Sequence, residues 1–179
     1  EEQHRKHVED KMFTRTETSN DRNDETKAVL WFDLQNVLSC PKAEISNFYY
    51  KSKFSVYNLT AHLSTTKQVY YALWDESQMR WSGNEIASAL LKILNAVYKD
   101  NPQIRELILW SDSCVPQNKN SLMAYAIGYF LSQNSGIGTI IMKSATPGHS
   151  PIQEIDNVHS CIEKVLSKAE YYSPISLFT

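Results

Sequence analysis

The hydrophobic pattern of this chain changes its period near residue 82, and this change constrains the fold more than any other feature. Before it, short apolar runs rich in β-branched and aromatic residues, typical of strands, follow one another with only turns between them. After it, amphipathic segments with apolar residues every three or four positions alternate with further short apolar runs. Three strands followed by alternating helices and strands predict an α/β domain whose mixed sheet is covered by helices.

The individual elements follow from the same patterns. We expect strands at residues 28–37, 48–63, 68–74, 104–110 and 136–142, and helices at 82–99, 121–133 and 154–169. Ser82, with Glu85 three residues later, forms a capping box at the start of the first of these helices. The short STTK connection makes the second and third strands antiparallel neighbours. The predicted order is β-β-β-α-β-α-β-α, with no internal repeat.

Length and composition set the outer limits. The 179 residues fit one domain, and a net charge of −2 means that any DNA contact needs a local basic patch or flanking regions. Residues 1–27 are almost wholly polar and predict a solvated helix that passes into a linker at residues 18–27. We expect the domain over residues 28–170 and, at residues 171–179, the tail of a longer chain.

Two further classes of protein are disfavoured by composition. The 3 cysteines are odd in number and widely spaced, so they predict neither a disulfide framework nor a zinc knuckle, which suits a reducing intracellular compartment. No apolar run approaches the roughly 18 residues that a membrane span needs, so we expect no membrane contact.

Two aspartates interrupt apolar strands. Asp33 lies inside AVLWFDLQNVL, and Asp112 directly follows LILWS. The element order matches the ribonuclease-H-like fold, in which the first and fourth strands are neighbours at the sheet centre. Asp33 and Asp112 would then face each other, and Asp156, at the start of the last helix, would complete the group.

Such a group predicts metal chemistry. Carboxylates that converge from distant positions repel one another, so they are stable together only when cations neutralise them. Oxygen ligands alone suit Mg²⁺ or Mn²⁺. Two such ions would activate a water or a 3′-hydroxyl and stabilise the leaving oxygen of a phosphodiester.

Each acidic residue also has a structural interpretation. An aspartate at a strand end is often a turn residue, and an acidic residue in a first helical turn complements the helix dipole. The third acid therefore stays open between Asp156 and Glu154. Glu85 is first of all a capping-box residue, with an auxiliary role at the site as the alternative.

The polar residues around the acids add candidates. Asn118 and Asn120, in SDSCVPQNKN, either hydrogen-bond phosphates or cap the helix that follows. His149 lies on a glycine-proline loop that leads toward the acidic group, so it is a candidate for contact with phosphate or the attacking water. His159 follows Asp156 by three residues, close to one helical turn, and could orient that carboxylate. For both histidines the alternative is a purely structural role.

Four blocks of this sequence resemble, in order, those of a large group of transposon-derived proteins common in insects and other animals. The blocks are FDLQNVL, YYALWDESQMRWSGNEIASALLK, LWSDSCVPQNKN and GHSPIQEIDNVHSCIE. The group carries FDLQ, WDE followed by R-G-x-x-EI, FSDNCxGQNKN and GHTxxExDxxHxxIE. The blocks are short but specific as an ordered set, and the resemblance covers about residues 28–170.

That group is regarded as related to DDE/D-type transposases with a ribonuclease-H-like core. The resemblance implies that the acidic positions, which bind Mg²⁺ or Mn²⁺, are Asp33, Asp112 and Asp156, and that the last block is completed by His149, Glu154, His159 and Glu163. It further implies metal-dependent DNA cleavage and strand transfer in the nucleus. DNA is then the main partner, with a homo-oligomer or host proteins as further partners.

The sequence departs from the group's pattern in three places. Ser113 replaces an asparagine, Pro116 replaces a glycine, and the last block carries one extra residue before Glu154. These departures support the alternative interpretation, in which the domain is catalytically inactive and retained as a module that binds proteins or nucleic acid.

Overall fold

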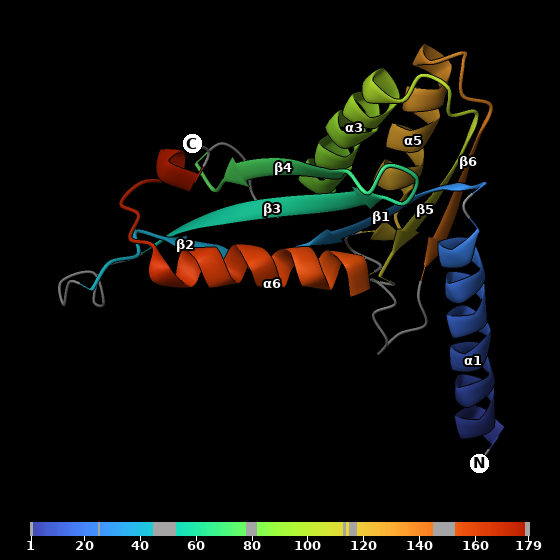
Figure 1. Cartoon of the computed structure of the whole chain (residues 1–179), viewed down its shortest axis with the longest axis horizontal. Coiled ribbons are helices and arrows are strands. Elements are labelled where there is room, and N and C mark those ends of the chain that lie inside the picture. The colour runs from blue at the N-terminus through green and yellow to red at the C-terminus, as the bar shows by residue number, and fades with distance from the viewer. Residues whose placement is uncertain are drawn as a thin grey trace.

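A computed structural model describes residues 2–24, 26–44, 53–77, 82–112, 114, 118–144 and 153–177, with the side chains of 2–4, 6, 7 and 153 excepted. These residues form an α/β fold in which helices cover both faces of one six-stranded mixed sheet (Figure 1). The elements are α1 (Glu2–Asn23), β1 (Ala28–Leu34), β2 (Leu38–Cys40), β3 (Phe54–Leu63), β4 (Val69–Asp75), α3 (Gly83–Asp100), β5 (Glu106–Ser111), α5 (Ser121–Gln133), β6 (Thr139–Ser144), α6 (Gln153–Lys168) and the 3₁₀ helix η1 (Pro174–Leu177).

The sheet is organised around β3. Strand β4 pairs with one side of β3, and β1 and β2 pair one after the other with its other side, all antiparallel. Strand β1 then pairs with β5, and β5 with β6, both in parallel. The predicted pairing of the first strand with the strand that precedes Asp112 is therefore confirmed, and so is the antiparallel pairing across STTK.

The strand expected over residues 28–37 is interrupted. It ends at Leu34 and resumes at Leu38 as the short β2, which gives the sheet one strand more than predicted. Between them the N–H of Gln35 donates to the carbonyl of Asn58 on β3, and the Asn58 amide donates to the Gln35 side chain at 2.9 Å. The chain therefore follows β3 across the break, held by polar contacts.

The larger core lies between the sheet and the two helices α3 and α5. Side chains alternate between the faces of a strand, so Leu30 and Phe32 of β1 point to this side. The apolar stripe of α3 packs there as predicted, with Ile86, Ala89, Leu90, Ile93, Leu94 and Val97 buried. This core fixes the central strands and leaves the opposite face for polar groups.

The opposite face is covered by α6 and by the end of α1. Trp31 of β1 and Trp110 of β5 stack with ring centroids 5.6 Å apart, and Ile155 of α6 packs in the same buried cluster. Among the described helices, none has the length and apolar character that a membrane crossing requires.

The linker expected at residues 18–27 is helical as far as Asn23, and its side chains are part of the packed structure. Asp21 is 2% exposed and accepts hydrogen bonds from the Trp110 indole at 2.9 Å and the Lys143 ammonium at 2.7 Å. Burial acts to raise the pKa of Asp21, but these hydrogen bonds and the Lys143 charge outweigh it and lower the pKa. The polar sequence does not predict this contact, because the burial of Asp21 depends on partners from β5 and β6.

The segment expected as a tail also contacts the domain. Tyr171 is buried, exchanges backbone hydrogen bonds with Lys42, and packs against Cys40 and Val56.

Candidate active site

The register of the two central strands determines where the aspartates lie. Trp31 pairs with Trp110 in the parallel β1–β5 ladder. Asp33 lies two residues beyond Trp31 in β1, so its side chain shares the face of Trp31, which α6 covers. Asp112 directly follows the last residue of β5.

Asp33 is in an environment that opposes its charge. Burial, and after it the charges of Asp112 and Asp156, raise its pKa to about 7, against a hydrogen bond from the Leu34 N–H. Asp112, at the end of β5, and Asp156, on α6, are thus close enough to act on Asp33.

Asp112 is held by its own loop. One carboxylate oxygen, Oδ1, accepts hydrogen bonds from the Cys114 N–H at 3.1 Å and from the Asn118 amide. Asn118 is itself buried, and its N–H donates to the Cys114 carbonyl at 2.7 Å. These contacts fix the orientation of Asp112 through Oδ1.

The two asparagines of SDSCVPQNKN have different tasks. Asn120 caps α5, because its side chain accepts from the Met123 N–H at 2.9 Å, as one of the two sequence interpretations predicts. Asn118 does not cap that helix. It supports Asp112 instead, which neither sequence interpretation anticipated.

Glu154 and Asp156 interact with different partners. Glu154 is paired with Arg22 of α1, with Nε–Oε1 at 2.6 Å and a second contact of 3.1 Å, while the Arg22 guanidinium lies over the Trp31 ring. Asp156 is exposed and acts electrostatically on Asp33. The geometry therefore favours Asp156 as the third acid and assigns Glu154 to the contact between α1 and α6.

The structure describes only one of the two candidate histidines. His149 lies outside the described residues. His159 is half-buried on α6, and burial lowers its pKa while the charges of Asp156 and Glu163 oppose that shift. Its Nε2 has no hydrogen-bond partner within the described part of the chain, so the link to Asp156 is electrostatic.

Sequence reasoning missed a polar row on β3 beside Asp33. Thr60 is the direct neighbour of Asp33 in the β1–β3 ladder, and Asn58 and His62 lie on the same face. Each has a buried side-chain atom with no hydrogen-bond partner among the described residues. The alternation of these residues with Tyr57, Leu59, Ala61 and Leu63 was the signal that could have revealed them.

Glu85 lies away from the candidate site. It lies on α3, which packs on the opposite face of the sheet, and its carboxylate bonds to the Ser82 hydroxyl. The predicted capping box is therefore present.

A divalent cation needs oxygen ligands and negative charge. Carboxylate oxygens are the ligands that Mg²⁺ and Mn²⁺ prefer, and the pKa of Asp33 is raised first by burial and then by the nearby charges of Asp112 and Asp156. Within the described residues, however, no three acidic, histidine or cysteine side chains converge closely enough to hold an ion. The chemistry of the site thus fits a divalent cation, while a complete ligand set needs a shift of Asp156 or a further donor.

No model of a known protein family matches this chain, and no curated protein sequence matches it. Its function has to be inferred from the residues and their placement.

Proposed function

We propose that this chain is a ribonuclease-H-like domain that cleaves DNA and transfers strands with the help of divalent metal ions. The strand order β4-β3-β1-β5-β6, with the first strand beside the first crossover strand, is the order expected for that fold. The four sequence blocks that resemble transposon-derived proteins support the same assignment.

One observation carries the proposal. Asp33 lies on β1 and Asp112 directly after β5, the strand paired with β1, and the pKa of Asp33 is raised to about 7 by burial and by neighbouring carboxylates. A merely structural aspartate gains nothing from such a position, because burial without a counter-charge destabilises it. A bound cation removes that penalty, since it favours the ionised form of all three acids.

Each residue has a task in this reaction. Asp33, Asp112 and Asp156 would hold the metal. Asn118 and the Cys114 N–H keep Asp112 in one orientation through Oδ1. A bound divalent ion would supply Lewis acidity at the phosphodiester.

Substrate binding relies on local contacts. The chain carries 18 basic and 20 acidic residues, so its overall charge does not attract DNA. Contacts beside the site, together with flanking regions of a longer protein, are the proposed route for transposon ends or host DNA. We place this activity in the nucleus, where that DNA is.

The experiment is a cleavage assay on labelled duplex DNA with Mn²⁺ or Mg²⁺. We expect nicked or cleaved products that disappear with EDTA and with Asp112→Asn. The control is Glu9→Gln, because Glu9 is highly exposed on α1 and far from the site in sequence. Metal-dependent products that persist in Asp112→Asn would refute the assignment of this residue.

A second candidate is a catalytically inactive module that binds proteins or nucleic acid. The lack of three converging ligands among the described residues favours it. The two candidates differ in metal binding: the inactive module neither cleaves DNA nor changes its melting temperature with Mn²⁺.

A further inference from the structure

Strand β4 lies at one edge of the sheet, and no described strand pairs with its outer side. At the two ends of the β3–β4 ladder, the Leu63 N–H donates to the Gln68 carbonyl, and the Glu76 N–H donates to the Ser55 carbonyl. Because hydrogen-bonded pairs alternate along an antiparallel ladder, the N–H and C=O groups of Val69, Tyr71 and Leu73 point outward.

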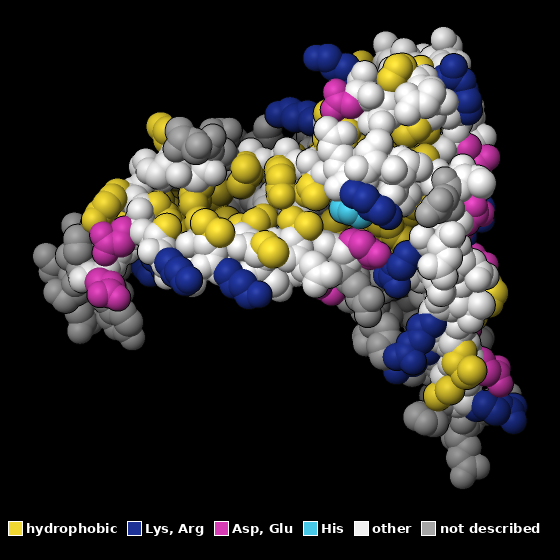
Figure 2. Space-filling model, viewed as in Figure 1, with side chains coloured by type: hydrophobic (Ala, Val, Ile, Leu, Met, Phe, Trp, Pro, Cys, Tyr) yellow, Lys and Arg dark blue, Asp and Glu magenta, His cyan; other side chains and the backbone are white. Residues whose placement is uncertain are grey.

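This edge lacks the usual protection. Natural edge strands are blunted by lysine, proline, bulges or short length. Strand β4 runs for 7 residues, VYYALWD, with none of these devices. Tyr71 is 48% exposed, and Figure 2 shows hydrophobic side chains gathered between β4 and α6 on the face in view.

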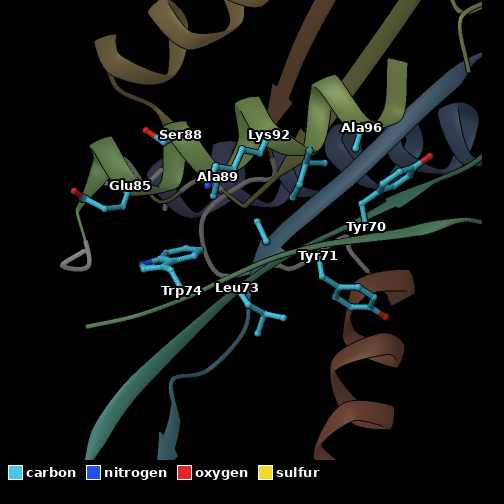
Figure 3. A pocket seen from close by; sticks show the side chains of 11 residues that line it. Tyr70, Tyr71, Leu73, Trp74, Glu85, Ser88, Ala89, Lys92 and Ala96 are labelled. Carbon is cyan, nitrogen blue, oxygen red and sulfur yellow. The ribbon is translucent and has the colours of Figure 1, made fainter. Parts of the chain in front are cut away.

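A groove of about 290 Å³ lies between β4 and α3. Figure 3 shows α3 running along the strand, with Glu85 near Trp74 at one end and Ala96 near Tyr70 at the other. Between these two aromatic residues the walls are small side chains, Ala72 of β4 with Ser88 and Ala89 of α3. Their size leaves room for one large side chain from outside.

The groove also offers polar groups that lack partners. Trp74 is only 6% exposed, and its indole N–H has no hydrogen-bond acceptor among the residues that the structure describes. Lys92 lines the groove from α3 and is exposed, and no carboxylate of the described residues is within ion-pair distance of it. Both groups are donors, so an occupant must bring acceptors.

We propose that β4 and the groove beside α3 bind an extended peptide segment of another protein, which adds to the sheet as a further strand. Main-chain groups of the segment pair with Val69, Tyr71 and Leu73. A large apolar side chain of the segment enters the groove over Ala72, and an acidic side chain pairs with Lys92. This surface is on the other face from Asp33, so binding there is independent of the proposed cleavage.

The test uses a phage-displayed library of random linear peptides about ten residues long, selected on the full chain. We expect enriched sequences that alternate apolar with polar residues and contain an acidic residue. The decisive variant is Tyr71→Pro, which removes one outward N–H without removing a ladder hydrogen bond. Its matched control is Tyr71→Ala, which loses the same ring but keeps the N–H.

A synthetic peptide of the enriched sequence should bind Tyr71→Pro at least about fivefold more weakly than Tyr71→Ala, since one hydrogen bond is lost. Lys92→Glu should weaken the acidic peptide and favour a version in which lysine replaces its acidic residue. The proposal is overturned if the wild type enriches no peptides beyond those that the Tyr71→Pro protein enriches. It is also overturned if the synthetic peptide binds both Tyr71 variants with equal affinity. A wild-type dimer that becomes monomeric in Tyr71→Pro shows instead that the edge pairs with itself.

Discussion

At the scale of single residues, neighbours determine what each acidic side chain can do. Asp21 and Asp33 are both enclosed, but Lys143 and Trp110 donate to the first, while other carboxylates surround the second. The pKa of Asp21 is lowered and that of Asp33 is raised. The same residue type therefore stabilises the fold at one position, while at the other it is a proposed ligand of a cation.

Stability of the metal-free protein should fall as pH rises. The pKa of Asp33 is about 7 in the folded protein, against an ordinary aspartate pKa of 3.8. Between these pH values the folded state therefore binds more protons than the unfolded state. The contribution of Asp33 to the free energy of unfolding then decreases from about pH 4 to about pH 7 and is constant above. Asp33→Asn should remove a penalty on the order of a few kcal/mol at pH 8 and nothing at pH 4.

Urea unfolding in EDTA at the two pH values measures this difference for the wild type and the variant. An equal effect of the substitution at both pH values would show that Asp33 does not titrate with a raised pKa.

Asn118 should matter for both stability and metal binding. Asn118→Leu has a similar size but cannot donate to Asp112. We expect a loss of about 1–2 kcal/mol of unfolding free energy, because a hydrogen bond to a charged group is lost. Mn²⁺ should also bind more weakly to this variant, as measured by calorimetry. Asn120→Leu, which removes only a helix cap, is the comparison: it should cost a similar amount but leave Mn²⁺ affinity unchanged.

At the scale of elements, α1 and α6 meet over one face of the sheet. Arg22 of α1 joins Glu154 of α6, while Glu17 and Asp21 of α1 join Lys143 of β6. The end of α1 is therefore tied to both α6 and the sheet, although its sequence predicts no contact with the domain.

Asp21→Ala tests how strongly the end of α1 is bound to the sheet. The change leaves the Trp110 indole N–H without its acceptor and takes one of the two carboxylates from Lys143. We expect a loss of about 2–4 kcal/mol of unfolding free energy in urea. Glu9→Ala, on the exposed part of the same helix, should cost less than about 0.5 kcal/mol. Similar small effects at both positions would mean that the end of α1 is a solvated linker after all.

At the scale of the whole molecule, the sheet separates two surfaces. The carboxylates lie on the side of α6, while the groove along β4 opens toward α3. Metal binding and peptide binding can thus be measured separately, and failure of one leaves the other untouched.

Mn²⁺ should raise the melting temperature of the wild-type protein. A ligand that binds only the folded state stabilises by about 2.7 kcal/mol at a hundred times its Kd. For a domain of this length that corresponds to roughly 5–10 °C. Differential scanning fluorimetry with millimolar Mn²⁺ measures the shift.

Asp112→Asn should abolish the Mn²⁺ shift while preserving the fold, and it should raise metal-free stability because one repulsive charge is gone. Glu9→Gln should respond to Mn²⁺ as the wild type does. A wild type that ignores both Mn²⁺ and Mg²⁺ would favour the inactive module over the nuclease.

The sequence alone determined the elements and the order in which they occur. Periodicity located α3, α5 and α6 within one residue at each end, because their apolar stripes depend on local spacing. It also located Asp33 and Asp112 as charges that interrupt apolar runs. Boundaries were less accurate where polar residues continue a strand, as at Gln35 between β1 and β2.

Only the tertiary structure determined the partners. Asn118 supports Asp112, Glu154 pairs with Arg22, and Asp21 is buried under Trp110, although nothing in the local sequence distinguishes these residues from solvated ones. Hydrophobic periodicity records which side of an element faces the core. The burial and pairing of a polar side chain depend instead on groups that arrive from distant parts of the chain, and folding alone brings those groups together.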